Sequence, residues 1–360
     1  MISKFKSVLG VAAIVLVSTV GADLVLAQIA KRIIPEWRNS AANAAYRERH
    51  PVYHHGLAPM VSSTSTSGEH AAYFATNALG FRDTKPRPVD PARAAKRIVV
   101  FGDSFTEGAN LNYEDTYVGR ISAVLAADGY EVLNAAVASY APTIYYAKLR
   151  YLLKTQALKM SDAVVFIDLS DIWDEATCYQ LNPDNTVGNR CNYDDRPMKR
   201  FKKWLAEVSL SYHTYRMIKD RLKEKGRRKV GHFEAVTNWE RARWTVDKSL
   251  WEKIGRPGLA QARARMDDFK ALADEYGIAV TVAVYPWPDQ IAAGDKDSVQ
   301  VRYWRDWARQ AGARFVDLFP PFFEGDGRAA IERYFTPYDF HYNKAGHALV
   351  AGAFLAQWHP

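Results

Sequence analysis

The stretch RIVVFGDSFTEG, residues 97–108, decides how this sequence folds. A short β-branched run ends at a glycine, a serine follows two residues later, and a helical pattern comes next. Similar runs, each followed by helical periodicity, recur at residues 131–136, 163–169, 279–285 and 314–318. This alternation predicts a three-layer α/β/α fold with a doubly wound, flavodoxin-like sheet of about five parallel strands.

The expected helices lie at residues 114–127, 143–154, 258–276, 299–311 and 344–358. Asn343 is the expected N-cap of the last one, because its side chain can accept the free N–H groups of a first helical turn. We place the α/β domain at residues 92–360. Residues 184–255, rich in Trp, Tyr and Arg, are expected to form a helical insertion that caps one end of the sheet.

Two further regions precede this domain. Residues 35–91 are expected to be an irregular lead-in with a loop at 62–68, and residues 1–34 a signal-anchor or a signal peptide. Lysines at the start followed by about 20 apolar residues fit a retained membrane helix with a cytoplasmic N-terminus, which we favour. Small residues before Gln28 also fit cleavage and secretion. Both alternatives place the body of the protein outside the cytoplasm.

Composition and charge narrow the function. Hydrophobic residues make up 48% of the chain and charged residues 24%, which indicates a globular protein and not a disordered one. Of the net charge of +8, much comes from residues 219–229, which hold seven Lys and Arg. One local run is typical of a solvated helix end, and its alternative partners are anionic lipid or an acidic polymer. A nucleic-acid partner is not expected, because no basic face extends over the domain.

The two cysteines of the chain are Cys178 and Cys191. They are too few for a disulfide scaffold and lack zinc-finger spacing. Because they lie close together in a polar loop of a protein expected in an oxidising compartment, we expect them to form a disulfide.

Polar residues follow the expected strands at one edge of the sheet, where open parallel sheets bind their ligands. Ser104 follows the first strand, Ser139 the second and Ser170 the third, while Asp339 and His341 come after the fifth. A serine hydroxyl becomes a good nucleophile when a base takes its proton, and histidine is the usual base. A carboxylate that orients the ring completes a triad. Ser104, His341 and Asp339 are therefore candidates for such a triad. The alternatives are a serine that only caps a helix and a polar loop in which Asp339 and His341 are solvated.

His347 is the rival base, although its place in the last helix favours a packing role. Asp339, His341 and His347 lack the two-histidine helical spacing of hydrolytic zinc sites. Neither a metal nor another cofactor is expected.

The run YPWPDQ, residues 285–290, follows the fourth strand at the same edge. Trp287 is a candidate for stacking on a sugar ring, with Asp289 or Gln290 bonding sugar hydroxyls. The alternative is a rigid turn, bracketed by prolines, with a buried tryptophan.

Four blocks of the sequence resemble those of the SGNH (GDSL-type) hydrolases: GDSFT at 102–106, NAAVASY at 134–140, VFIDLSD at 165–171, and DFH at 339–341 followed by Asn343, Gly346 and His347. The run NALGFRD at 77–83 resembles a lead-in of membrane-anchored members. The likeness spans residues 77–358. It implies a three-layer α/β/α fold and hydrolysis of esters, often acetyl esters on carbohydrate, through an acyl-enzyme. It also implies that Ser104 is the nucleophile, His341 the base and Asp339 the acid that orients it.

The resemblance also implies an oxyanion hole made by the N–H of Ser104, the N–H of Ser139 and the side chain of Ser170. The family usually has Gly in place of Ser139 and Asn in place of Ser170. The acid lies two residues before the histidine, where many members have three. Proteins that resemble the polysaccharide O-acetylation group share the shorter spacing.

Three functions follow from these residues. The first is an extracytoplasmic serine esterase that acts on O-acyl, chiefly O-acetyl, carbohydrate. The second is a polysaccharide O-acetyltransferase that uses the same triad. The third is a non-catalytic glycan-binding or scaffold protein, which the residues at 139 and 170 favour and the intact triad opposes.

Overall fold

The structure, a computed structural model, describes residues 2–34, 46–65, 72–93, 96–108, 111–191 and 197–359. The chain forms two compact units, one made of residues 1–44 and 192–229 and the other of residues 45–191 and 230–360. The second unit contains every predicted site residue.

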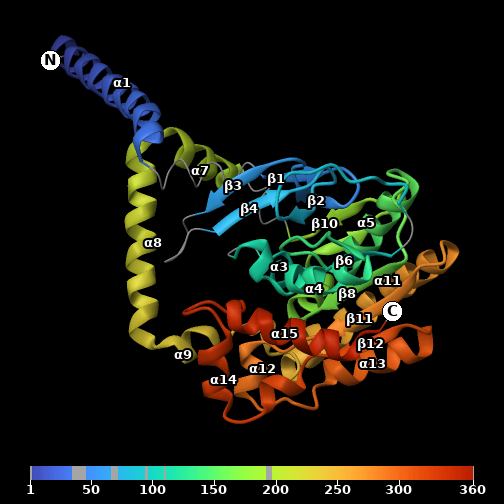
Figure 1. The fold of residues 1–360 in the computed structure, drawn as a ribbon. Coiled ribbons are helices and arrows are strands. Elements are labelled where there is room, and N and C mark those ends of the chain that lie inside the picture. Colours follow the sequence, from blue (N-terminus) through green and yellow to red (C-terminus); the bar gives the residue numbers. More distant parts are fainter. Residues whose placement is uncertain are drawn as a thin grey trace. The chain divides into compact units, whose positions relative to one another are not determined.

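An eight-stranded sheet forms the centre of the larger unit, in the order β12-β11-β8-β6-β7-β5-β4-β3 (Figure 1). Its parallel part has the flavodoxin-like order that the sequence predicts. The predicted fold class is therefore confirmed. The parallel strands, each within two residues of its expected range, are β7 (Glu131–Asn134), β6 (Arg97–Phe101), β8 (Asp162–Ile167), β11 (Ala279–Val284) and β12 (Arg314–Asp317).

Helices cover both faces of these strands. Neighbouring residues of a strand point to opposite faces of the sheet, so an apolar strand has side chains to bury on both faces. Phe101 pairs in register with Val165, so Phe101 and Phe166 face opposite layers. The ring of Phe101 meets Phe269 at 5.3 Å between centroids, whereas Phe166 meets Phe354 at 5.6 Å. One layer thus contains α11 (Arg256–Glu275) and the other contains α15 (Lys344–Gln357).

Three more helices lie near their expected ranges: α4 (Tyr117–Leu125), α5 (Pro142–Lys154) and α13 (Val299–Ala311). In α13 both ends match the expected residues. Asn343 caps α15 as predicted, since its side chain accepts the N–H groups of Ala345 and Gly346. The helix α6 (Leu169–Thr177), which begins two residues after β8, was not predicted.

The expectation of an irregular lead-in is wrong. Its described part contains a hairpin, β1 (Arg47–His50) with β2 (His54–Leu57), and three strands that extend the main sheet in antiparallel fashion. These are β3 (Ser62–Ser65), β4 (Ala72–Thr76) and β5 (Arg82–Asp83). The strands are short, and all but β4 are rich in His, Ser or Arg, so they lack the apolar alternation by which a strand is recognised. Of the loop expected at 62–68, the first four residues are β3 and the rest lie outside the described residues.

The NALGFRD run forms the turn between β4 and β5. Asn77 accepts the N–H groups of Leu79 and Phe81 through its side chain, at 3.0 and 3.2 Å. Gly80 has a φ of +68°, and a Cβ there would lie 2.2 Å from the carbonyl oxygen of Leu57. The turn therefore requires glycine at this position.

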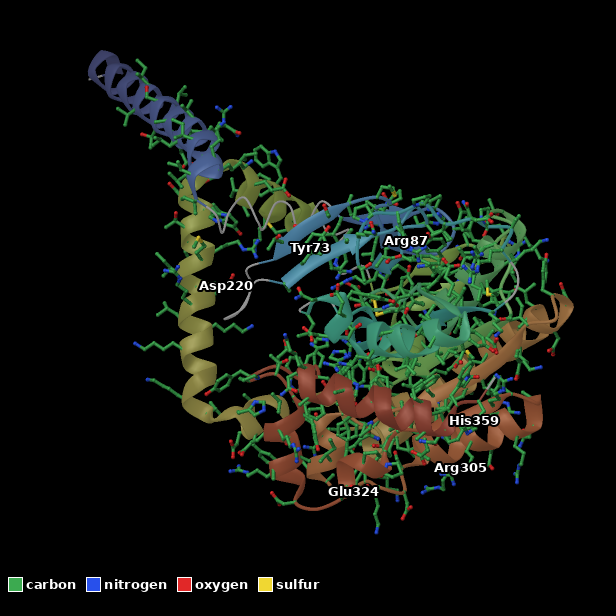
Figure 2. The ribbon with its side chains drawn as sticks, viewed as in Figure 1. Tyr73, Arg87, Asp220, Arg305, Glu324 and His359 are labelled. Atoms are coloured by element: carbon green, nitrogen blue, oxygen red, sulfur yellow. A yellow bond between two sulfur atoms is a disulfide. The ribbon has the colours of Figure 1, made fainter. Side chains whose placement is uncertain are left out.

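Two arginines fasten the lead-in to the core. Arg82 is buried and donates to the carbonyl oxygen of Gly108, at 3.2 Å, just after the helix that begins with the predicted nucleophile. Arg87, labelled in Figure 2, bonds to Asp83 at 2.8 Å and to Glu131 on β7 at 3.0 Å. The lead-in is thus part of the domain and not a linker to it.

The insertion does not form a single cap, because it is divided between the two units. Its first part pairs β10 (Val187–Asn189) with β9 (Tyr179–Leu181). Residues 192–229 belong to the smaller unit. The last part packs on the core, where Trp244 is buried and its Nε1–H donates to the carbonyl oxygen of Leu169 at 3.0 Å.

The smaller unit contains α1 (Ile2–Ile33), α7 (Pro197–Val208) and most of α8 (Leu210–Val230). Asp23 accepts both the N–H and the hydroxyl of Ser211, at 2.8 and 2.7 Å. Residues 14–33 have a mean hydropathy of 1.7 and are long enough to cross a membrane, a test that a signal sequence also passes. The described side chains of the basic run at 219–229 are exposed on α8.

Candidate active site

The predicted nucleophile lies where β6 ends and the one-turn helix α3 (Ser104–Glu107) begins. Asp103 caps this turn, because its side chain accepts the N–H of Phe105 at 3.0 Å. A Cβ on Gly102 would lie 2.0 Å from Oγ1 of Thr106, so the tight turn needs glycine. Because α3 is only four residues long, its dipole contributes little to the site.

Ser104, His341 and Asp339 form one hydrogen-bonded chain. His341 Nε2 lies 2.8 Å from Ser104 Oγ, and His341 Nδ1 lies 2.6 Å from Asp339 Oδ1. Since an ionised carboxylate only accepts, Nδ1 carries the ring proton. Nε2 is then the acceptor for the hydroxyl of Ser104. The structure therefore brings Ser104 together with Asp339 and His341, which follow it far along the sequence.

The loop that carries His341 joins α14 (Gly327–Tyr334) to α15 and is closed by its own backbone. The N–H of Asp339 donates to the carbonyl oxygen of Thr336, and the N–H of Thr336 donates to that of His341, at 2.9 and 2.8 Å. These backbone hydrogen bonds hold Asp339 and His341 in one turn.

The surroundings of His341 favour its protonated form on balance. Burial alone lowers the pKa of the imidazole, but the hydrogen bond to Asp339 and the negative charges of Asp339, Asp103 and Asp168 outweigh it. The net effect is a raised pKa. A base with a raised pKa takes up a proton more readily.

Trp287 packs against the loop that carries His341 and does not face solvent. It is 1% exposed, its ring stacks on Phe340 at 4.6 Å between centroids, and its Nε1–H donates to Asp168 at 2.8 Å. Phe340 directly precedes His341. The interpretation of Trp287 as a sugar-stacking residue is therefore corrected in favour of the buried-tryptophan alternative.

Asp289 and Gln290 are buried too, at 5% and 0% exposure. Asp289 accepts the N–H groups of Asn238 and Trp239, at 2.6 and 3.0 Å. Gln290 donates to the hydroxyl of Ser298 at 3.0 Å. Their polar atoms hold neighbouring loops in place, so direct bonds to a sugar are not open to them here.

The hydroxyl of Ser170 is not free to donate a hydrogen bond to an oxyanion, as the resemblance implied. Its hydroxyl is 2.8 Å from Asp168 Oδ1 and 3.2 Å from Asp103 Oδ2, and the residue is 3% exposed. A hydroxyl has one hydrogen to donate, and here it is committed to a carboxylate.

Sequence reasoning missed the group of buried carboxylates behind Ser104. Oxygens of Asp103, Asp168 and Asp171 lie within 4.8 Å of one another, a grouping that can hold a cation. Burial and the neighbouring Asp168 raise the pKa of Asp103 to about 7, and burial raises the pKa of Asp171 well above its usual range. The signal was present: Asp103 lies two residues after β6 and just before Ser104, and Asp168 directly follows β8, two residues before Ser170.

The turn that carries Ser139 is held from several sides. Ala138 donates its N–H to Glu107 at 2.6 Å, and Arg47 of β1 bonds to the same carboxylate at 2.6 Å. Lys148 is buried and donates to the carbonyl oxygen of Ala135 at 2.7 Å. Ser139 itself is exposed with a φ of +65°, and within the described part of the chain its N–H has no acceptor.

His347 is a packing residue. It is 2% exposed and its Nδ1 accepts the backbone N–H of Tyr117 at 3.0 Å. Burial, reinforced by His341, lowers the pKa of His347 to about 3. The rival base therefore lies inside the protein with its acceptor occupied.

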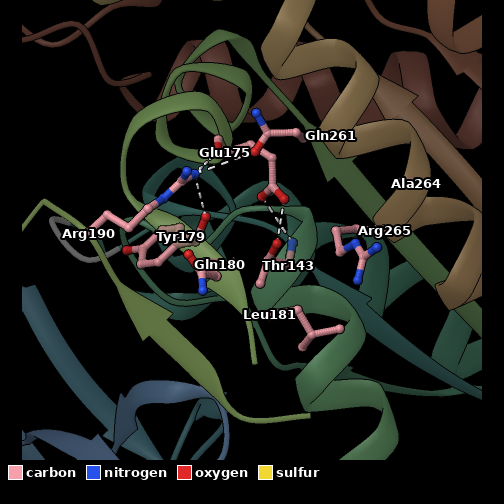
Figure 3. Close-up of a pocket in the computed structure, with 9 residues that line it drawn as sticks. All are labelled: Thr143, Glu175, Tyr179, Gln180, Leu181, Arg190, Gln261, Ala264 and Arg265. Atoms are coloured by element: carbon pink, nitrogen blue, oxygen red, sulfur yellow. Dashed lines mark hydrogen bonds between the residues drawn. The ribbon is translucent and has the colours of Figure 1, made fainter. Parts of the chain in front are cut away.

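Cys178 and Cys191 are joined by a disulfide that closes the β9–β10 hairpin. A pocket of about 230 Å³ opens beside this hairpin (Figure 3). None of the triad residues contributes to it. Its walls are formed by Thr143, Glu175, Tyr179, Gln180, Leu181, Arg190, Gln261, Ala264 and Arg265.

No protein-family model matches the sequence, and no curated protein matches it. Among solved structures, an acetylxylan esterase from Geobacillus stearothermophilus is 15% identical, over 74% of this chain and 96% of its own, with a TM-score of 0.42. An α/β hydrolase from the metagenome of Lake Arreo, Spain, is 16% identical over 73% and 95%, with a TM-score of 0.40. A G-D-S-L family protein from Desulfitobacterium hafniense is 13% identical over 73% and 99%, with a TM-score of 0.40.

Proposed function

We propose that the protein is an extracytoplasmic serine esterase of the SGNH type, anchored by α1, that hydrolyses O-acyl esters on carbohydrate. The observation that carries the proposal is the chain from Ser104 Oγ through His341 to Asp339, with links of 2.8 and 2.6 Å. This geometry meets the requirement for an activated serine: a base within hydrogen-bond reach and an acid that fixes its tautomer.

In the proposed reaction, Ser104 Oγ attacks the ester carbonyl while His341 Nε2 takes the hydroxyl proton. The imidazolium, stabilised by Asp339, returns that proton to the leaving alcohol. Water then attacks the acyl-enzyme, with His341 as base again, and releases the acid and free Ser104.

We assign the oxyanion to the backbone N–H groups of Ser104 and Ser139. What supports Ser139 is its exposed N–H, which has no acceptor among the described residues. Ser170 is assigned a supporting role, because its hydroxyl is bonded to carboxylates and holds Asp103 beside the nucleophile. Two backbone donors, already oriented, stabilise developing negative charge without reorganisation.

The carbohydrate part of the proposal rests on the spacing of the acid and the base. Asp339 lies two residues before His341, as in proteins that resemble the polysaccharide O-acetylation group. An acetyl ester is the simplest substrate, and the same acyl-enzyme accepts a sugar hydroxyl in the transferase alternative.

The first test compares purified full-length protein with its Ser104→Ala variant on p-nitrophenyl acetate and on an acetylated oligosaccharide. Removing the nucleophile is expected to lower kcat by about 10⁴-fold. A fluorophosphonate probe should label the unmutated protein and Ser122→Ala, a control serine on α4, but not Ser104→Ala.

Adding an unacetylated glycan separates the two catalytic alternatives. An esterase releases acetate whether or not the glycan is present, whereas a transferase yields an acetylated glycan. If every ester remains intact and no serine is labelled, the catalytic proposal is wrong and the scaffold alternative stands.

A further inference from the structure

The peptide that presents the N–H of Ser139 is fixed from its opposite side. In a trans peptide the N–H points away from the preceding carbonyl, so whatever holds the carbonyl oxygen of Ala138 also aims the N–H of Ser139. That oxygen lies 2.9 Å from Nε2 of His55, a residue of the lead-in strand β2. No cis peptide is found among the described residues.

His55 belongs to a chain of hydrogen bonds that runs from Asn189 through His54 and His55 to the carbonyl oxygen of Ala138. The donor and the acceptor of each bond in this chain can be assigned. A carbonyl only accepts, so His55 carries its proton on Nε2 and must accept on Nδ1. His54 Nδ1, 2.7 Å away, is therefore the donor to His55. His54 Nε2 then accepts from the side-chain amide of Asn189, at 3.0 Å. The oxygen of that amide accepts the N–H of Cys191 at 2.9 Å, which agrees with this orientation.

The other end of Ser139 is held by the same hairpin. Tyr179, on β9, donates its hydroxyl to the carbonyl oxygen of Ser139 at 2.6 Å and is 5% exposed. Burial raises the pKa of Tyr179, so its hydroxyl stays protonated and remains a donor. Tyr179 follows Cys178, and Asn189 precedes Cys191 by two residues, so both contacts arise beside the disulfide.

This support matters because Ser139 occupies a conformation that it does not adopt readily. Its φ of +65° lies in the left-handed region, where a side chain clashes with its own backbone. Such a conformation persists only where surrounding contacts enforce it. Glycine would need no such enforcement at this position.

We propose that His55 and Tyr179 are positioning residues for the oxyanion site, and that the disulfide-closed hairpin, residues 178–191, holds the Ser139 turn in its active form. The inference deepens the proposed function and rests on it. It predicts that the hairpin affects turnover although it contains no residue of the triad.

The kinetic test uses full-length protein with p-nitrophenyl acetate. His55→Leu should lower kcat about tenfold to a hundredfold with KM nearly unchanged, because a misaimed oxyanion donor affects the transition state and not the ground state. His55→Gln, whose amide can donate in place of Nε2, should recover a large part of the loss. Tyr179→Phe should lower kcat about threefold to tenfold.

Two comparisons make the kinetic test specific. The control variant is Tyr303→Phe. Tyr303 lies in α13, and its hydroxyl likewise donates to a backbone carbonyl oxygen, that of Leu259. Removing this bond should leave kcat unchanged. In a Ser139→Gly background, Tyr179→Phe should cost less than in the unmutated protein, because glycine adopts the turn unaided. Equal costs in the two backgrounds would contradict the positioning role.

Hydrogen exchange tests the same inference without relying on activity. Amide exchange in residues 135–141 should accelerate about tenfold in His55→Leu and in the double variant Cys178→Ser, Cys191→Ser, but not in Tyr303→Phe. Unchanged exchange together with kcat values within twofold of the control would overturn the inference. If the unmutated protein has no esterase activity, the proposed function fails, and exchange alone decides whether the hairpin holds the turn.

Discussion

At the scale of single residues, the tautomer of His341 decides which ring nitrogen can accept a proton from Ser104. Its Nδ1–H is bound to Asp339, so Nε2 faces Ser104 as an acceptor. The net raised pKa of His341 means that the ring is protonated, and unable to act as a base, up to a higher pH than an ordinary histidine.

We therefore expect kcat/KM to rise with pH through a midpoint above 6.5, the usual value for histidine. In Asp339→Asn the hydrogen bond and charge that raise the pKa are lost, so the midpoint should move to lower pH. The same change should lower kcat by about 10³- to 10⁴-fold. A pH series on both proteins measures this, and an unchanged midpoint in the variant would show that Asp339 does not act on His341.

At the scale of elements, the sequence predicted the strands and helices that are marked by long apolar runs or by a long apolar periodicity. The five parallel strands and most of the helices that cover them lie near their expected ranges, because each buries a continuous apolar face. The strands of the lead-in were missed because they are only two to five residues long and most of them carry polar side chains. Strands β3, β4 and β5 extend the main sheet, whereas β1 and β2 pair with each other, and no local pattern reveals these pairings.

The same limit applied to the candidate site. Residues with recognisable chemistry at strand ends, Ser104 and His341, were placed together correctly. For Trp287 the sequence left sugar stacking and burial both open, because it does not tell which side of a turn faces solvent. The contributions of His55 and Tyr179 were invisible, since each reaches its partner from a distant part of the chain.

The turn between β4 and β5 offers a test of how firmly the lead-in is tied to the domain. Gly80→Ala should lower the free energy of unfolding by about 3 kcal/mol, because the added methyl both meets the carbonyl of Leu57 and sits at positive φ. Gly277→Ala is the matched control. Gly277 has a similar φ of +66° with open space around it, so its loss should be roughly 1–2 kcal/mol. Denaturant unfolding of the two variants compares these losses; equal values would mean that the β4–β5 turn relaxes away from Leu57.

At the scale of the whole molecule, the chain combines a compact α/β unit with a smaller helical unit that contains α1. Within the smaller unit, Ala27 and Ala30 are buried beside Leu210, and Asp23 is bonded to Ser211. These contacts use the second half of α1, beyond Asp23. The uncharged residues before Asp23 are then the ones that we expect to enter lipid.

We expect the full-length protein to sediment with membranes and to stay there after an alkaline carbonate wash, because insertion of an apolar helix is not reversed by salt or pH. Removing residues 2–34 should release it to the soluble fraction. Recovery of the full-length protein in the soluble fraction, with a new N-terminus at Gln28, would instead show that the segment is a cleaved signal.

The extension of the sheet by β5, β4 and β3 bears on where a recombinant version of this protein should begin. A gene fragment trimmed to the five parallel strands, starting at residue 92, would discard Arg47, His54 and His55 and leave β7 as a bare edge. Exposed strand edges of this kind promote aggregation. An expression clone meant for crystallisation or assay should therefore retain the chain from residue 46 onward.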